Sequence, residues 1–237
     1  QALVLVGVSV QLSGFATSIY LHRCLAHRAV WLHPLPAFFM RLQLWLATGI
    51  VPREWVAVHR KHHHFPDTEG DPHSPLLLGL SKVLFGNAYY YAREAAKPET
   101  LDRYASDICQ DWLDRHLFHY GGLGIGVGLV ICVALLGPWW GIPAYLALGA
   151  TYIFLNAVIN GVCHVVGYKN FSNTATNLRS VAWLTGGEGL HNNHHAFPSS
   201  PKFSVRASEF DPAWPVLRLL AQFRLAKLRP VPAQVNS

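Results

Sequence analysis

The chain has 237 residues, of which 51% are hydrophobic and only 14% are charged, and its formal net charge is +6. A soluble domain of this size usually carries about 25% charged residues, so the composition indicates a membrane protein formed as one domain, residues 1–237. The basic residues form no dense run. They therefore point to an anionic membrane surface or an acidic partner, and not to a nucleic acid.

The first apolar segment covers residues 2–21 and contains no charged residue. A stretch of about 20 apolar residues is long enough to cross a hydrocarbon core. No basic stretch precedes this segment, so we expect a mature membrane span and not a signal peptide. The chain starts with Gln1 in place of methionine, and we expect that sequence upstream of it has been lost.

The second apolar segment, residues 35–51, contains Arg41 and Gln43 near its middle. An arginine at the centre of a bilayer costs at least about 2.5–3.5 kcal/mol on insertion scales. We therefore expect an amphipathic helix that lies in the membrane plane, or re-enters it, and does not cross.

Two further uncharged segments, residues 120–137 and 141–163, are separated by the sequence GPWWG at 137–141. Glycine, proline and tryptophan together are typical of a tight turn at the membrane interface. These segments predict a hairpin that crosses the membrane and returns.

The basic residues indicate which parts stay outside the bilayer. All 19 Lys and Arg lie in residues 22–119 or 164–237, which predicts that both parts are cytoplasmic. The expected fold is an all-α, multi-pass membrane bundle with a cytosolic histidine-rich cap and one in-plane helix. Three crossings place Gln1 on the far side, so a cytoplasmic N-terminus requires one more upstream helix.

Four histidine motifs carry the chemistry: HRCLAH at 22–27, HRKHHH at 59–64, NGVCH at 160–164 and HNNHH at 191–195. Residues at positions i, i+3 and i+4 share one face of a helix. This spacing relates His59, His62 and His63, and likewise His191, His194 and His195. Asn160 and His164 are four apart. The in-plane helix and the hairpin keep all four motifs on one side of the membrane.

The first motif departs from this spacing, because His22 and His27 are five residues apart. An ideal α-helix does not bring both rings to one face. Either the helix widens or ends there, or the two rings serve different metals.

Nine histidine nitrogens exceed the three or four ligands of one zinc site and suit two metals with four or five ligands each. Imidazole binds zinc, copper, iron and nickel alike. We expect nearby carboxylates to orient the rings by accepting the second ring N–H; the candidates are Glu54, Asp67, Glu69, Asp71 and Glu188. The other histidines are interpreted as ordinary polar residues: His33, His64, His73, His116 and His119.

The order HRCLAH, EWVAVHRKHH with DTEGDPHSP, NGVCH and GGEGLHNNHHAFP resembles the integral-membrane acyl desaturases of the stearoyl-CoA desaturase type. The resemblance covers about residues 14–200. It implies four transmembrane helices, an in-plane helix and a cytosolic di-iron centre, in which zinc can replace iron in a purified sample. Carried over by position, the iron ligands are His22, His27, His59, His62, His63, His164, His191, His194 and His195, with Asn160 acting through a water.

The resemblance also implies the reaction: oxygen-dependent insertion of a cis double bond into a saturated acyl chain, carried by coenzyme A, another thioester or a lipid. O2 is the co-substrate, and two electrons come from a ferredoxin or cytochrome b5 type of donor. An acyl or lipid hydroxylase with the same metals is the alternative. A metal transporter would need ligands within its spans, and a zinc hydrolase would need fewer ligands, so we expect neither.

One face of the first span is a candidate wall for the acyl chain. Val10, Gly14 and Ser18 lie 12, 8 and 4 residues before His22, and we expect this face to border a tunnel with Val10 and Gly14 near its closed end. Close packing between helices explains the small residues equally well. Trp55 and Trp183 are further candidates for the wall, although anchoring at the interface also accounts for tryptophans.

Overall fold

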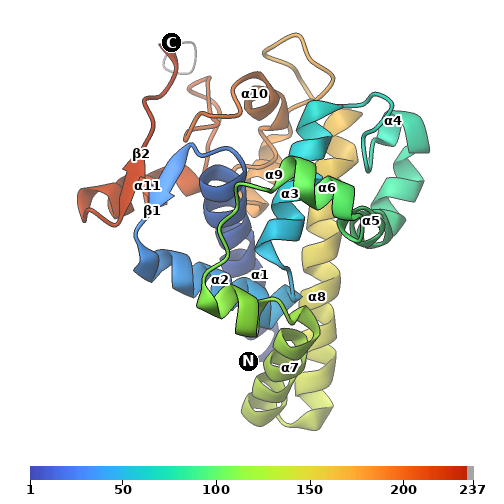
Figure 1. Cartoon of the computed structure of the whole chain (residues 1–237), viewed down its shortest axis with the longest axis vertical. Helices are drawn as coiled ribbons and strands as arrows, with labels where there is room; N and C mark the ends of the chain where they lie inside the picture. The colour runs from blue at the N-terminus through green and yellow to red at the C-terminus, as the bar shows by residue number, and fades with distance from the viewer. Residues whose placement is uncertain (234–237) are drawn as a thin grey trace.

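The computed structural model describes residues 1–233, which are mostly helical (Figure 1). The chain begins with α1 (Ala2–Ala16), which continues without interruption into a π-helix, η1 (Thr17–Ala26). Together they form an apolar helix of 25 residues, long enough to cross a membrane. Residues 16–23 are all buried, so the first histidine motif begins in the interior.

The second apolar segment forms α2 (Pro34–Thr48), which is followed by α3 (Pro52–His64) at an angle of 88°. Gly49, in the left-handed conformation that glycine tolerates best, ends α2. Arg41 is accommodated because its Nη1 donates to Asp111 at 2.9 Å and to Asp114 at 2.7 Å. The guanidinium is therefore paired and not exposed to hydrocarbon.

The predicted hairpin consists of α7 (Gly121–Leu136) and α8 (Pro138–Asn160). Only Gly137, with φ +73°, separates the two helices. The turn is tight, as predicted, but the second helix begins at Pro138 and not at residue 141, so both tryptophans belong to the first turn of α8. The helix that includes α8 extends from Pro138 to His164 and is long enough to cross a membrane, whereas α7 has only 16 residues.

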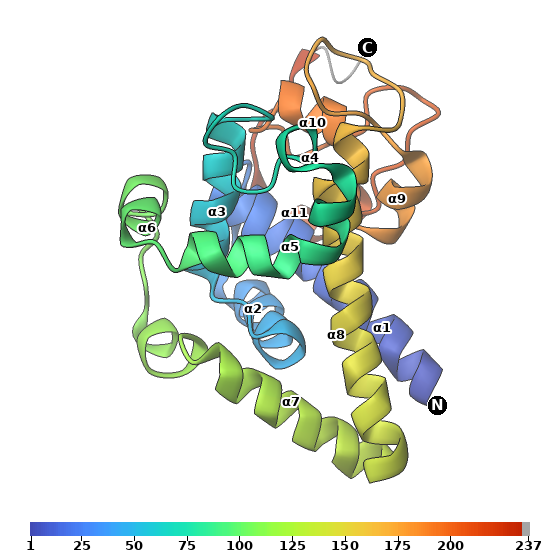
Figure 2. The ribbon, with the colours of Figure 1, turned by 90° about the vertical axis from the view of Figure 1, so that its right-hand side faces the viewer.

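Small residues let α7 contact α2 directly. A Cβ atom at Gly124 would lie 2.3 Å from the Trp45 carbonyl oxygen, and one at Gly128 would lie 2.1 Å from that of Leu46. No larger residue fits at either position. α7 is thus held against α2, and α8 contacts both α7 and α1 (Figure 2).

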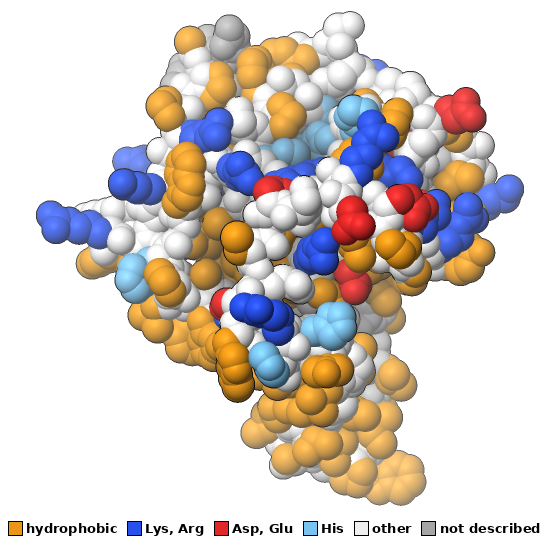
Figure 3. All heavy atoms as spheres, viewed as in Figure 1, with side chains coloured by type: hydrophobic (Ala, Val, Ile, Leu, Met, Phe, Trp, Pro, Cys, Tyr) orange, Lys and Arg blue, Asp and Glu red, His pale blue; other side chains and the backbone are white. Residues whose placement is uncertain are grey.

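The remaining helices are α4 (Pro75–Leu78), α5 (Leu80–Ala95), α6 (Pro98–Tyr104), η2 (Asp114–Phe118), η3 (Val162–His164), α9 (Arg179–Leu184), α10 (His191–Ala196) and α11 (Ala213–Gln222). Most of them form a cap around α3 and the end of α8, whereas η2 packs on α2 and α11 packs on η1. Hydrophobic side chains cover the end formed by α7 and α8, whereas charged side chains gather around the cap (Figure 3). The surface is therefore divided as expected for a membrane protein with a polar cap.

One element departs from the all-α prediction. Strand β1 (Val30–Leu32) pairs antiparallel with β2 (Ala226–Leu228), and Trp31 lies opposite Lys227. Each strand has only three residues and the two are far apart in sequence, so neither shows a local strand pattern. The ribbon ties the C-terminal part of the chain to the segment between η1 and α2.

Candidate metal centre

Nine histidines from four parts of the chain converge in two groups. The first group contains His22, His27, His59, His63 and His194, and the second contains His62, His164, His191 and His195. Within each group, one nitrogen per ring lies within 4.8 Å of all the others. Because the motifs on either side of α2 meet at one site, α2 does not carry the chain to the opposite side of the molecule.

The π-helix explains how His22 and His27 reach the same group. In η1 the backbone N–H of His27 donates to the carbonyl of His22 at 3.0 Å, which is the i to i+5 pattern. A helix of this pitch places residues five apart above one another, and the ring centroids are 4.9 Å apart. The first of the two alternatives is therefore observed: the helix widens at this motif, and His22 and His27 belong to the same group.

The Nε2 atoms point inward in both groups. In the first, Nε2 of His194 lies 2.9 Å from that of His22 and 2.9 Å from that of His63, and the Nε2 atoms of His27 and His59 are 2.8 Å apart. In the second group the distances are 3.0 Å for His164–His191, 3.1 Å for His191–His195 and 3.3 Å for His62–His195.

These distances fit a shared cation. Two nitrogens bound about 2.0–2.1 Å from one ion lie roughly 2.9–3.4 Å apart at bond angles of about 90–109°. Hydrogen bonds alone do not explain the arrangement, because Nε2 of His194 faces two other ring nitrogens and a neutral imidazole has one N–H in total. The two groups are therefore able to hold two metal ions.

Three carboxylates lie behind the rings, and two of them hydrogen-bond to a ring nitrogen. His62 Nδ1 lies 2.9 Å from Asp71, His164 Nδ1 lies 2.6 Å from Asp67, and His22 Nδ1 lies 2.5 Å from Glu188. A proton on Nδ1 leaves the lone pair on Nε2, which is the atom that faces the group. The prediction is confirmed for Asp71 and Asp67, which hydrogen-bond to His62 and His164. Glu188 lies close to His22 without a hydrogen bond to its Nδ1, and the prediction is wrong for Glu54 and Glu69, which hydrogen-bond to none of the nine rings.

Burial favours the neutral form of the three histidines of the last motif. It lowers the pKa of His191, His194 and His195 well below the usual histidine value, and the charges that neighbouring rings would carry lower it further. Neutral rings at neutral pH present lone pairs to a cation.

Arg23, which the sequence did not single out, joins the first motif to the C-terminal part of the cap. The fully buried guanidinium donates to both carboxylate oxygens of Asp211, at 3.0 and 2.9 Å, and to the Pro201 carbonyl at 3.1 Å. Its carbon Cζ lies 3.6 Å from the centre of the Phe203 ring. Both oxygens of Asp211 accept from Nη2, and this buried charge-assisted pair sets the position of the residue next to His22.

The two asparagines of HNNHH have a structural role. Asn192 accepts hydrogen bonds from the backbone N–H groups of Asn170 and Phe171, and its Nδ2 donates to three oxygens of residues 171–175. Asn193 donates to Glu209 and to the Phe203 carbonyl. These bonds hold α10 in the loops around it, and thereby orient His191, His194 and His195.

His73 was wrongly interpreted as an ordinary interfacial residue. It is buried and its ring stacks on that of His62, with centroids 4.8 Å apart. Its backbone N–H donates to Asp71, which also faces the His62 ring. The sequence DPH so close to a histidine motif was the available signal. The other four histidines outside the motif spacing belong to neither group, as expected: His33, His64, His116 and His119.

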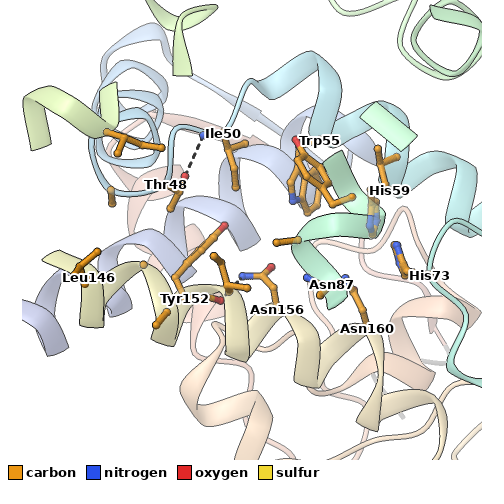
Figure 4. Close-up of a pocket in the computed structure, with 18 of the residues that line it drawn as sticks. Thr48, Ile50, Trp55, His59, His73, Asn87, Leu146, Tyr152, Asn156 and Asn160 are labelled. Carbon is orange, nitrogen blue, oxygen red and sulfur yellow. Dashed lines mark hydrogen bonds between the residues drawn. The ribbon is translucent and has the colours of Figure 1, made fainter. Parts of the chain in front are cut away.

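A cavity of about 520 Å³ reaches the metal centre from between α2, α5, α7 and α8. Apolar residues such as Ile50, Ile125 and Ile153 line much of it. At the other end lie His59 of the first group, His73 and Asn160 (Figure 4). A volume of this size and character is typical of a small-molecule site.

Comparison with known proteins agrees with the site. The family model described as fatty acid desaturase matches residues 1–230. The chain belongs to the fatty acid desaturase family. It is 31% identical to "Delta-9 acyl-lipid desaturase 2" of Arabidopsis thaliana, over 95% of this chain and 73% of that protein. It is 32% identical to "Acyl-CoA 5-desaturase AL21" of Anemone leveillei, over 94% and 69%.

The cavity does not follow the predicted face of the first span. Trp55 lines it and stacks on His59 at 4.7 Å, but Val10, Gly14, Ser18 and Trp183 do not line it. Val10 instead packs against Ala47 and Leu148, which is the helix-packing alternative. The Ser18 hydroxyl donates to the Gly186 carbonyl at 2.8 Å.

The other two predicted site residues, Trp183 and Asn160, differ in their surroundings. Trp183 is exposed and contacts Phe210. Asn160 lines the cavity one turn before His164, and its Nδ2 donates to Asn87 at 3.0 Å. The amide oxygen of Asn160 is thus left to interact with a ligand or a water.

Proposed function

We propose that this chain is an O2-dependent acyl desaturase that inserts a cis double bond into a saturated chain held in the cavity. One observation carries the proposal: an apolar cavity ends at residues that belong to or contact both histidine groups. An unactivated methylene enters such a cavity easily, and its oxidation requires a redox metal, because side-chain acids and bases cannot remove its hydrogens.

The proposed metals are two irons. The first is held by the five-histidine group and the second by the four-histidine group, with Asn160 contributing through a water. When bound, the irons supply the chemistry that oxidises a C–H bond with O2. The overall reaction balances when –CH2–CH2– and O2, with two electrons and two protons, give –CH=CH– and two waters.

The protein's own residues orient the chain and exclude water. Trp55, stacked on His59, forms a flat wall beside the first group. Tyr152 lines the cavity, and its hydroxyl is held by Thr17 at 2.7 Å. These fixed groups restrict which methylene pair reaches the metals, and position is what separates one desaturase product from another.

We propose a saturated acyl thioester or acyl lipid as the substrate and a ferredoxin or cytochrome b5 type of protein as the electron donor. The names of the relatives include both acyl-lipid and acyl-CoA desaturases. We place the metal centre on the cytoplasmic side, because every Lys and Arg lies outside residues 1–21 and 120–163.

The test is product analysis on the iron-loaded protein in membranes, with a reductant and saturated acyl substrates of graded length. We expect alkenes; alcohols as the main product would establish the hydroxylase alternative. No oxidised product with iron bound at both groups would refute the proposal.

Three glycine variants test where the acyl chain of the substrate lies. Gly149 lines the cavity and has open space around it, so Gly149→Leu should reduce activity on the longest substrates by about tenfold or more. Gly126→Leu, on α7, also meets open space but does not line the cavity, and should change nothing. Gly14→Leu tests the face predicted from the sequence. A changed chain-length profile in Gly14→Leu and not in Gly149→Leu would move the acyl site to α1.

A further inference from the structure

Helix α11 lies where the first span meets α2. Its Ala213 and Leu217 are buried in one cluster with Ile19 of η1, and Phe15 and Met40 pack against the same cluster. The helix begins two residues after Asp211, the partner of Arg23. The packing around Phe15 and Ile19 therefore determines where along the first span α11 lies.

The opposite face of α11 is uncovered and carries both apolar and polar side chains. Leu219 is 54% exposed, and Phe223, which directly follows the helix, is 66% exposed. Arg218 and Gln222 are exposed beside them. Trp31 of the adjoining β-ribbon is 50% exposed, and α2, which follows that ribbon, exposes Leu35 and Phe39. Large exposed side chains on neighbouring elements mark an interaction surface.

The charge on this surface has a single sign. Arg218, Arg224, Lys227 and Arg229 occur in residues 213–233, which contain no Asp or Glu. The three carboxylates of residues 164–233 all belong to buried side chains, namely Glu188, Glu209 and Asp211. Basic side chains gather along the edge where Figure 1 places α11 and β2, beside hydrophobic surface (Figure 3).

We propose that α11 and the β1–β2 ribbon, here named the C-terminal anchor, bind the anionic phospholipid headgroups of the membrane that the first span crosses. Apolar and basic side chains on one helix face are typical of a helix lying in the interface, with its arginines at the headgroups. An acidic carrier protein would complement the charge but would leave Leu219 and Phe223 without an apolar environment. The packing of α11 against Phe15 and Ile19 places the helix beside the first span, which favours binding to the membrane over binding to a carrier protein.

The anchor also connects the lipid surface to the metal centre. α11 continues from Asp211, and Asp211 holds Arg23 beside His22. Anionic lipid that orders α11 should therefore stabilise the Arg23–Asp211 pair. The proposal itself requires only a membrane protein and does not depend on the proposed reaction.

The test uses the full chain in vesicles, with an environment-sensitive fluorophore on Gln222→Cys and the exposed Cys109 replaced by Ser. Gln222 is exposed and precedes Phe223. Lipids with a nitroxide close to the headgroup report contact by quenching. We expect strong quenching with 30% phosphatidylglycerol, and weak quenching for a reference label at Glu99→Cys on α6.

Charge-neutral variants supply the control. In the double variant Arg218→Gln/Arg224→Gln, quenching should increase less with the phosphatidylglycerol content. We expect the loss of each arginine to reduce this increase by about fivefold. Arg93→Gln/Arg103→Gln, on exposed residues of α5 and α6, should leave it unchanged. Leu219→Ser/Phe223→Ser should reduce quenching at every lipid composition.

Three results would overturn the proposal. One is quenching at residue 222 no stronger than at residue 99. Another is equal quenching in pure phosphatidylcholine. The third is an Arg218→Gln/Arg224→Gln variant with unchanged quenching but impaired reduction by a carrier protein, which would assign the surface to that carrier.

Discussion

Replacing Arg23 by methionine should destabilise the chain more than any surface charge change. Arg23 is fully buried, and its partner Asp211 is 2% exposed. Removing one member of a buried ion pair leaves an uncompensated charge and typically costs about 3–5 kcal/mol. For a chain of this size each 1 kcal/mol lowers the melting temperature by about 2–4 °C. The expected decrease is therefore roughly 6–20 °C.

A second substitution separates the charge from the packing. Asp211 also accepts the backbone N–H groups of Phe203 at 2.8 Å and Ala213 at 3.1 Å. Asn keeps an acceptor for one of them without the charge, so Arg23→Met/Asp211→Asn should be more stable than Arg23→Met alone. Arg53→Met is the control, because Arg53 pairs with the largely exposed Asp102, and such a pair contributes about 0–1 kcal/mol.

The assay is thermal unfolding in detergent or nanodiscs, followed by intrinsic fluorescence and by metal content. The reasoning fails if Arg23→Met melts within about 2 °C of the parent chain or no lower than Arg53→Met. It also fails if the double variant is less stable than Arg23→Met, since the buried carboxylate would then not be the source of the loss.

Two further predictions concern the histidines. Asp67→Asn and Asp71→Asn should each weaken metal retention about 10–100-fold, because the carboxylates orient His164 and His62; metal analysis after a chelator challenge checks this, and equal loss in the exposed control Glu69→Gln would contradict it. The lowered pKa values of His191, His194 and His195 mean that, below about pH 6.5, the unfolded chain binds protons that the folded chain does not. Metal-free protein should therefore lose up to about 1.4 kcal/mol per pH unit for each histidine on acidification from pH 7 to 5; a melting temperature that rises over this range would be incompatible with buried neutral rings.

Much of the metal centre could be predicted because it depends on local spacing. His59, His62 and His63 share a face of α3 at any helix position, and hydropathy alone identified α1, α7 and α8. The role of Asp67 and Asp71 followed from their proximity in sequence to the ligands. These features involve residues a few positions apart, for which helix geometry is sufficient.

What only the tertiary structure decided involves residues far apart in the chain. The division of nine rings into five and four depends on how α3, α10, η1 and η3 approach one another, and hence His62 and His63 face different groups although they are adjacent. The pair Arg23–Asp211 spans 188 positions, and strand β1 has its partner near the C-terminus. The cavity lies beside α5 and α8, whereas Val10 is used for packing. Sequence periodicity determines which face a residue occupies, but which element covers that face depends on how all the helices fit together.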